Sequence, residues 1–480
     1  MPQRNWRPLA LSLMFVGSAA VLVRADETAS PAQAPTEKPS TSAGKETPAA
    51  EARQPTKPKE LSGSVTKGLK YLIAQQHENG GFGQGGGWRT GGDASGGRVE
   101  GTEVKDPPDM GNTCIAALAL IRAGNSPKDG PYAKQLTKAI DFIEQHVEEA
   151  DKDSLYVTPV RDTQLQSKIG KYIDTFLTAL VLSELKGQMP DQKSEARLFA
   201  ALNKTIGKIE ANQQADGTFA GNAGWASVLS QGICSKALNR AYQKGVRVKA
   251  ETIKKDFDQS VAQLDPSKAS PVGSPVSATA SPVAAAPSPA DVSGPVARPS
   301  FISKSAEGGS VAGKGDAGVA LYSLSANAGR VQDAVNSNGR KTAEARSVLS
   351  SPTADAKAKD GARRELKEVA DFEEANQQAV KEITTNIGSD RFLKGFGNNG
   401  GEEFLSFMNI SETLFAQGGE AWQKWDRQAC ETITKVQNED GSWSGHHCIT
   451  GRTFCTSTAL LTMLADRAPL PVAEVKPEAK

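Results

Sequence analysis

The chain has 480 residues, of which 38% are hydrophobic and 6% aromatic. Its 56 basic and 55 acidic residues leave a net charge of +1, which excludes the basic footprint of a nucleic-acid-binding protein and a polyanionic character. Because segments of low complexity dilute these averages, the parts that fold must be richer in hydrophobic residues than the whole chain.

Residues 1–25 are predicted to be a secretory signal peptide. Two basic residues, Arg4 and Arg7, precede an apolar stretch that ends at Val23. An uncleaved anchor is the alternative, but Arg24 interrupts the run before it reaches the thickness of a bilayer. We therefore expect a protein without an integral membrane segment, secreted or periplasmic after signal-peptide cleavage.

Three further segments are predicted to be disordered. Residues 26–60 form a linker rich in Ala, Pro, Thr, Glu and Lys, without a periodic apolar face. Residues 265–300 form a Pro/Ala/Ser spacer, and residues 468–480 form a tail. The region expected to fold is therefore 61–467, interrupted by the spacer.

Helical periodicity dominates the folding region. Apolar residues recur at the spacing of one helix face, as in Val65, Leu69 and Leu72. Twelve helices are expected, or six pairs, with no convincing strand. They lie around residues 65–73 and 115–121, and near 132–148, 172–187, 197–213, 225–245, 248–263, 316–335, 361–386, 402–418, 422–437 and 454–465.

One turn signature occurs three times, each at the end of a predicted helix. Glycine supplies the positive φ needed just past a helix C-terminus, and the glutamine amide can tie the last turn to the next segment. The aromatic ring is expected to pack the turn onto its neighbour. The three instances are Gln76, Gly80 and Phe82; Gln213, Gly217 and Phe219; and Gln437, Gly441 and Trp443.

This signature resembles the "QW" repeat of squalene–hopene cyclases, which also occurs more loosely in protein prenyltransferase β subunits. The first instance matches over the longest stretch, from Lys67-Gly68 through Tyr71-Leu72 to Phe82. The resemblance implies an all-α protein with an α6/α6 toroid, in which an inner ring of helices surrounds a cavity and an outer ring runs antiparallel to it. It covers residues 63–250 and 390–467 well and the middle poorly.

The catalytic motifs of those families are missing from the sequence. The Asp-x-Asp-Asp acid of the cyclases does not occur, and neither does the Asp-x-Cys zinc pair of the prenyltransferases. Cys455 falls roughly where the prenyltransferases carry their zinc-binding His, as a substitute ligand. The sequence therefore favours the family's scaffold without its known chemistry.

A His/Cys cluster lies just before the last predicted helix. It contains His446, His447, Cys448 and Cys455. These residues are suitable zinc donors, so zinc is a candidate although no cofactor is predicted. A Cys448–Cys455 disulfide is the favoured alternative in an oxidising compartment, and unpaired thiols are the third.

Polar residues expected at the starts of the inner helices are candidates for a ligand or acid/base site at the cavity mouth. Ordinary helix capping is the alternative explanation for at least half of them. The four principal candidates are Asp109, Asp174, Asn409 and Glu412.

The leading functional hypothesis is an exported repeat protein with this toroid scaffold that binds a ligand or protein partner in its cavity and lacks the known catalytic motifs of the family. One alternative is an enzyme on the same scaffold: a divergent isoprenoid cyclase or prenyltransferase, or a polysaccharide lyase or hydrolase. The other alternative is a structural surface protein, in which the spacers act as tethers.

Overall fold

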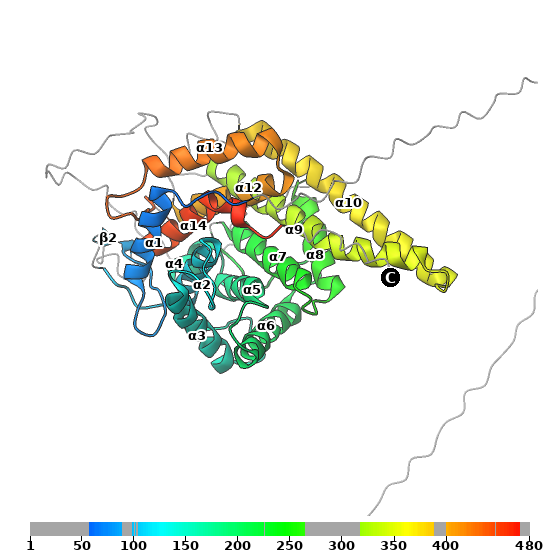
Figure 1. The fold of residues 1–480 in the computed structure, drawn as a ribbon, viewed down its shortest axis with the longest axis horizontal. Helices are drawn as coiled ribbons and strands as arrows, with labels where there is room; N and C mark the ends of the chain where they lie inside the picture. The colour runs from blue at the N-terminus through cyan, green and yellow to red at the C-terminus, as the bar shows by residue number, and fades with distance from the viewer. Residues whose placement is uncertain are drawn as a thin grey trace, which may run out of the picture. The chain divides into compact units, whose positions relative to one another are not determined.

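The computed structural model describes residues 57–88, 98–99, 101, 104–224, 226–264, 317–387, 400–446 and 448–470, all within the unit Ala52–Lys480. In this part of the chain it contains thirteen α-helices, one 3-10 helix and one two-stranded sheet (Figure 1). The protein is therefore mostly helical, as the periodicity predicts. All of the predicted signal peptide, most of the predicted linker and all of the spacer lie outside the described residues.

Six helices are buried around most of their circumference, and we call them the buried helices. All thirteen residues of α5 are buried, from Ile173 to Leu185, because apolar residues are distributed around the whole helix. In α9 most residues from Leu321 to Asn338 are buried, and in the remainder of the helix Ala345 is buried. The buried helices are α2 (Met110–Arg122), α5 (Ile173–Leu185), α7 (Ser227–Gln243), α9 (Ala317–Ser350), α12 (Gly401–Gln417) and α14 (Arg452–Met463).

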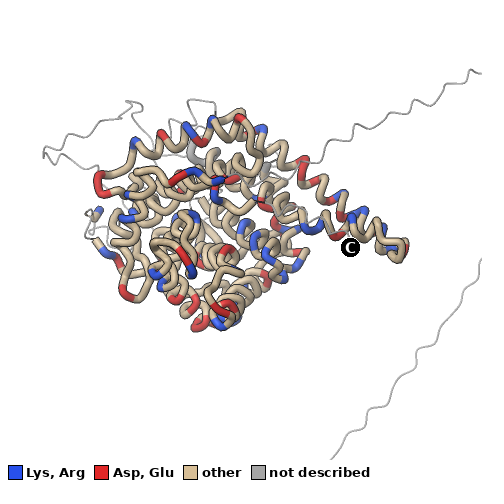
Figure 2. The backbone as a smooth tube through the Cα atoms, viewed as in Figure 1, with Lys and Arg blue, Asp and Glu red and all other residues tan. Residues whose placement is uncertain are grey.

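Six other helices are amphipathic and bury one stripe. In α3 the stripe runs through Leu136, Ile140, Ile143 and Val147, spaced so that they share one face. The amphipathic helices are α1 (Gly63–Gln75), α3 (Ala133–Glu149), α6 (Gln192–Asn212), α8 (Ala250–Leu264), α10 (Ala356–Ile387) and α13 (Gly419–Lys435). Basic and acidic residues are interspersed along α10 and α13 (Figure 2).

The buried helices contact one another in a cyclic order. Along the chain, α2 contacts α5, α5 contacts α7, α7 contacts α9, α9 contacts α12 and α12 contacts α14. The last of them, α14, contacts α2 again. Each amphipathic helix covers at least one buried helix: α1 lies on α14, α3 on α2, α6 on α5, α8 on α7 and α9, α10 on α9, and α13 on α12. Every buried helix is thus backed by at least one amphipathic helix.

The glutamines of the three repeated turns link successive amphipathic helices. Gln76 Nε2 donates to the carbonyl of Gln135 at 2.8 Å, which joins the end of α1 to the start of α3. Gln213 Nε2 donates to the carbonyl of Thr252 at 3.1 Å, joining α6 to α8. Gln437 Nε2 donates to the carbonyl of Ser64 at 2.9 Å, joining α13 to α1.

The glycines and aromatic residues of these turns have the roles that the signature predicts. Gly80, Gly217 and Gly441 all have positive φ, between +82° and +89°. The rings of Phe82, Phe219 and Trp443 are all buried. The rings fix each turn against the helices behind it.

Three features of the fold differ from the sequence expectations. A short helix, α4 (Gln164–Ile169), was not predicted, because one and a half turns are too short to show a period. The expectation of no strand is wrong, since β1 (Gly87–Trp88) pairs antiparallel with β2 (Arg98–Val99), each only two residues long. Helix α9 continues to Ser350 instead of ending near 335, and its second half pairs with α10 (Figure 1).

The folded part extends slightly beyond its predicted limits. Lys59, in the predicted linker, forms an ion pair with Asp426 of α13 at 2.6 Å. Its backbone N–H also donates to Asp466 at 2.7 Å, in the 3-10 helix Ala465–Arg467. Ala468, in the predicted tail, is buried. Among the described helices, none combines the length and the apolar character needed to cross a membrane.

Candidate functional site

Six buried ionic side chains meet between the buried helices, and we call them the ion cluster. They come from five of the six buried helices, and each is at most 6% exposed. Their formal charges cancel, with three cations and three carboxylates. The members are Arg122 of α2, Glu184 of α5, Lys236 and Arg240 of α7, Asp333 of α9 and Glu412 of α12.

Glu412 is the carboxylate that joins the cluster. Its Oε1 lies 3.1 Å from Arg122 Nη2, and its Oε2 lies 2.7 Å from Lys236 Nζ. Arg122 also pairs with Glu184 at 2.6 Å, and Lys236 also pairs with Asp333 at 2.9 Å. A single chain of contacts therefore connects α2, α5, α7, α9 and α12.

The electrostatics of the cluster favour the charged forms at its centre. Burial by itself raises the pKa of Glu412, but Lys236 and Arg122 outweigh burial and lower it to about 2. Burial likewise lowers the pKa of Lys236, whereas Asp333 and Glu412 raise it above its ordinary value. These ions are thus stable in the interior only as a set, because each needs its partners to offset desolvation.

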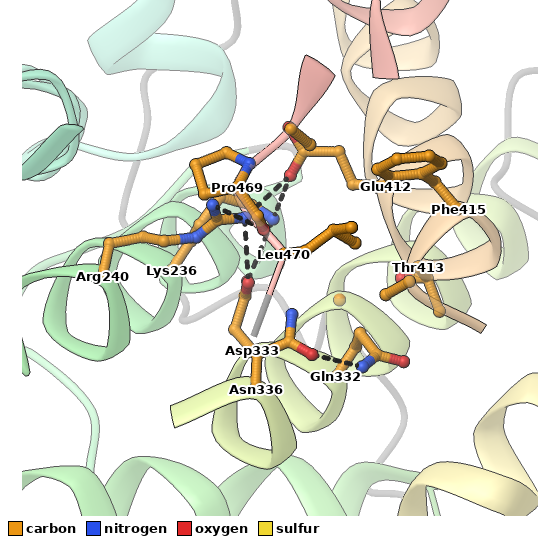
Figure 3. Close-up of a pocket in the computed structure, with 13 residues that line it drawn as sticks. Lys236, Arg240, Gln332, Asp333, Asn336, Glu412, Thr413, Phe415, Pro469 and Leu470 are labelled. Carbon is orange, nitrogen blue, oxygen red and sulfur yellow. Dashed lines mark hydrogen bonds and ion pairs between the residues drawn. The ribbon is translucent and has the colours of Figure 1, made fainter. Parts of the chain in front are cut away.

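A small pocket opens beside the cluster, with room for little more than a water molecule (Figure 3). Lys236, Arg240, Asp333 and Glu412 form its ionic side. The rest of the wall includes Gln332, Asn336, Thr413, Phe415, Pro469 and Leu470. Three buried polar atoms of the lining residues have no hydrogen-bond partner among the described residues: Thr413 Oγ1, Arg240 Nε and Asp333 Oδ2, of which the last is ion-paired with Lys236.

Sequence reasoning located this site only in part. Glu412 was predicted as a cavity residue, and it does line the pocket. Its expected position at a helix start is wrong, and so is that of Asn409, because α12 begins at Gly401 and both residues lie within the helix. The other five members of the cluster were missed. The available signal was a charge near the end of a largely apolar helix, such as Glu184 in α5.

A second polar site lies at the N-terminal ends of α2 and α5, whose C-terminal ends carry Arg122 and Glu184 of the ion cluster. Asp109 caps α2, and Asp174 lies in the first turn of α5. Both carboxyls flank Gly111: a Cβ there would be 3.6 Å from Asp109 Oδ1 and 2.7 Å from Asp174 Oδ1. Asp174 Oδ2 accepts a hydrogen bond from Gln166 Nε2 at 2.6 Å. The structure thus brings these two predicted candidates together, away from Glu412 and Asn409.

Burial dominates the protonation of this carboxyl pair. It raises the pKa of Asp109 to about 6, despite hydrogen bonds from Asn112. It raises the pKa of Asp174 to about 7, and the nearby charge of Asp109 adds to the shift. The pair therefore changes protonation close to neutral pH, where acid/base groups operate.

These shifts predict a stability that falls as pH rises. The pair is neutral in the folded state below its raised pKa values, so the stabilisation is complete below about pH 4 and is lost as pH rises towards 7. Replacing Asp174 with Asn should flatten this decline by roughly 2–4 kcal/mol between pH 4 and 7.5. Urea unfolding across this range measures it, and equal slopes for variant and wild type would contradict the prediction.

The His/Cys cluster is spread over a loop and a helix. No disulfide joins Cys448 to Cys455, and the Cys455 thiol instead donates to the carbonyl of Ile449 at 3.5 Å. The backbone of His446 accepts hydrogen bonds from Trp88 and Arg98, and His447 lies outside the described residues. Within the described part of the chain, no three His, Cys, Asp or Glu residues are grouped as metal ligands. Zinc and the disulfide stay predictions that metal analysis and thiol counting test.

No known protein family matches the chain, and a search of curated proteins found no relative.

Proposed function

We propose that the chain is an exported α6/α6 toroid, related to the terpenoid cyclase and prenyltransferase scaffold, that binds a ligand or protein partner in its interior. The cyclic order of contacts among the buried helices supports the ring, because α14 returns to α2. The amphipathic helices would form the outer layer, since one of them backs each buried helix.

The turn glutamines give a second, independent support for the ring. An open array of hairpins would leave its first and last outer helices without a common neighbour. Here Gln437, after the last amphipathic helix, donates to Ser64 at the start of the first. The family resemblance rests on the same three turns. Export is proposed from the sequence of residues 1–25 alone.

The observation that carries ligand binding is the unpaired polar lining of the pocket. Buried polar groups almost always have a partner, because an unmet hydrogen bond costs about 1–3 kcal/mol. Thr413 and Arg240 each have an atom without one, beside a pocket within the proposed ring. A water molecule fits the pocket as it stands, and a larger ligand would reach both groups by displacing Pro469 and Leu470, which line the same pocket.

The test compares ligand binding by wild type and a Thr413→Val variant, which removes the unpaired hydroxyl at almost constant volume. Three probes cover the hypotheses: an isoprenoid alcohol, a neutral oligosaccharide and a proline-containing peptide. Thermal unfolding with each probe should identify one that raises the melting temperature, and Thr413→Val should weaken its binding roughly fivefold to tenfold.

Thr384→Val is the matched control, because Thr384 is exposed on α10 and lies outside the pocket. Its binding should equal that of wild type. If no probe stabilises the protein, or if both variants bind like wild type, the proposal of interior binding is wrong. The alternative of a structural surface protein is then favoured.

A second candidate, an enzyme on the same scaffold, is favoured by the carboxyl pair Asp109 and Asp174. A buried acid whose pKa lies near 7 can donate and accept a proton at neutral pH. The pair could serve polysaccharide cleavage, for which an assay on acidic and neutral polysaccharides gives the direct test. Activity that survives Asp174→Asn would exclude the pair as its source.

A further inference from the structure

The chain's own residues 468–470, which we call the strap, form part of the wall of the pocket at the ion cluster, and Figure 3 shows Pro469 and Leu470 among the lining residues. The carbonyl of Pro469 accepts a hydrogen bond from Arg240 Nη1 at 3.1 Å. Leu470 packs against the hydrophobic core, and it lines the pocket together with Phe415. The strap therefore offers the pocket a carbonyl and an aliphatic side chain.

The charge of the pocket defines which ligands it accepts. The three cations and three carboxylates of the ion cluster already balance, with Lys236 bound to both Asp333 and Glu412. An added ion would be buried without a counter-charge, which is costly. A neutral group with a strong dipole, such as a peptide carbonyl, meets Arg240 without this cost.

The strap also has the conformation of a recognisable peptide class. Ala468 has φ −65° and ψ 144°, the values of a polyproline II helix. Pro469 fixes its own φ and disfavours a helical conformation at Ala468. Such segments are already extended, and they lose little entropy when they dock on aromatic surfaces.

We propose that the pocket is a binding site for an extended, proline-containing peptide, and that the strap occupies it as an intramolecular stand-in. The inference rests on the interior binding site proposed above and names its ligand. In the bound state the peptide carbonyl replaces that of Pro469 on Arg240, and an aliphatic side chain replaces Leu470 beside Phe415.

The strap is held lightly enough to exchange. Its outer two residues, Pro469 and Leu470, are only partly buried, in contrast to Ala468 and the ion cluster. Among the described residues, one hydrogen bond joins the strap to the ion cluster, from Arg240 Nη1 to the carbonyl of Pro469. A tethered strap nevertheless competes at a high effective concentration, so an external peptide should bind the intact chain weakly.

The test uses two shortened chains and a labelled peptide, Ala-Pro-Leu-Pro-Val, which copies residues 468–472. A chain ending at Arg467 lacks the strap and should bind the peptide about tenfold or more tightly than the full chain, by fluorescence anisotropy. A chain ending at Leu470 keeps the strap and is the matched control, with the affinity of the full chain. Ala-Ala-Asp-Ala-Val should bind neither.

A second variant keeps the test decisive if the chain ending at Arg467 does not fold. Leu470→Asp in the full chain weakens the strap at a partly exposed position, and it should also bind the peptide more tightly than wild type. If both altered chains fold, as judged by circular dichroism, and neither gains affinity, the peptide inference is overturned. Binding of an isoprenoid or oligosaccharide that Thr413→Val weakens would still uphold the interior site.

A peptide copying Ser270–Val276, Ser-Pro-Val-Gly-Ser-Pro-Val, separates two sources of the ligand. Tight binding of this peptide indicates that the spacer of a second copy can supply the occupant. Binding of the strap peptide alone assigns the site to sequences like the strap. Either result supports a proline-containing ligand.

Discussion

Replacing Glu412 with Gln should destabilise the protein by about 3–5 kcal/mol, the cost typical of breaking a buried ion pair from one side. The substitution preserves shape but leaves Arg122, Lys236 and Arg240 with two carboxylates, and so creates an uncompensated buried positive charge. Because Glu412 contacts Arg122 and Lys236 at 3.1 and 2.7 Å, both lose their common partner. Urea unfolding monitored by circular dichroism measures the loss.

Glu148→Gln is the control for this prediction. Glu148 also pairs with an arginine, Arg197, at 2.7 Å, but its side chain is 50% exposed. Exposed pairs contribute about 0–1 kcal/mol, so this variant should be nearly as stable as wild type. Similar losses in the two variants would contradict the importance assigned to the ion cluster.

Replacing Gly80 with Ala should destabilise the first repeated turn by about 2–5 kcal/mol. The residue has φ +89°, a conformation that costs an alanine about 1–2 kcal/mol. A Cβ would also lie 2.1 Å from the backbone carbonyl oxygen of Lys138, so α3 would have to move away from the turn, at a further cost of about 1–3 kcal/mol. Equilibrium unfolding gives the free-energy change.

Gly207→Ala provides the comparison. Gly207 lies inside α6 with open space around its Cβ position, so alanine should leave stability unchanged or raise it by up to about 1 kcal/mol. If both alanine variants behaved alike, the close approach at the turn would carry no energetic weight.

Helix positions were the most predictable part of the fold. The twelve predicted segments all correspond to helices, because long amphipathic or apolar periods are strong local signals. Neither α4 nor the two-residue strands are long enough to show a period in the sequence. The second half of α9 was missed because Val335 is followed by a run of polar residues, and its pairing with α10 is a tertiary contact.

The sites were less predictable than the fold, for a physical reason. Asp109 and Asp174 could be placed together because each begins a helix of the same kind. The ion cluster could not be anticipated, since Arg122 and Glu412 are separated by 290 positions along the chain. Which charges meet in the interior depends on helix rotation and register, and residue type alone does not reveal them.

Lys59 connects two parts of the folded region that are far apart in the sequence. Its backbone meets Asp466, and its carbonyl accepts a hydrogen bond from Arg467 Nη2 at 2.6 Å, across 408 positions of sequence. Two points that far apart in the chain are neighbours in space, so a short linker could join them and a new break could be opened in an exposed loop. The fold would then be open to circular permutation, with the same helices in the same neighbourhoods but a different first helix.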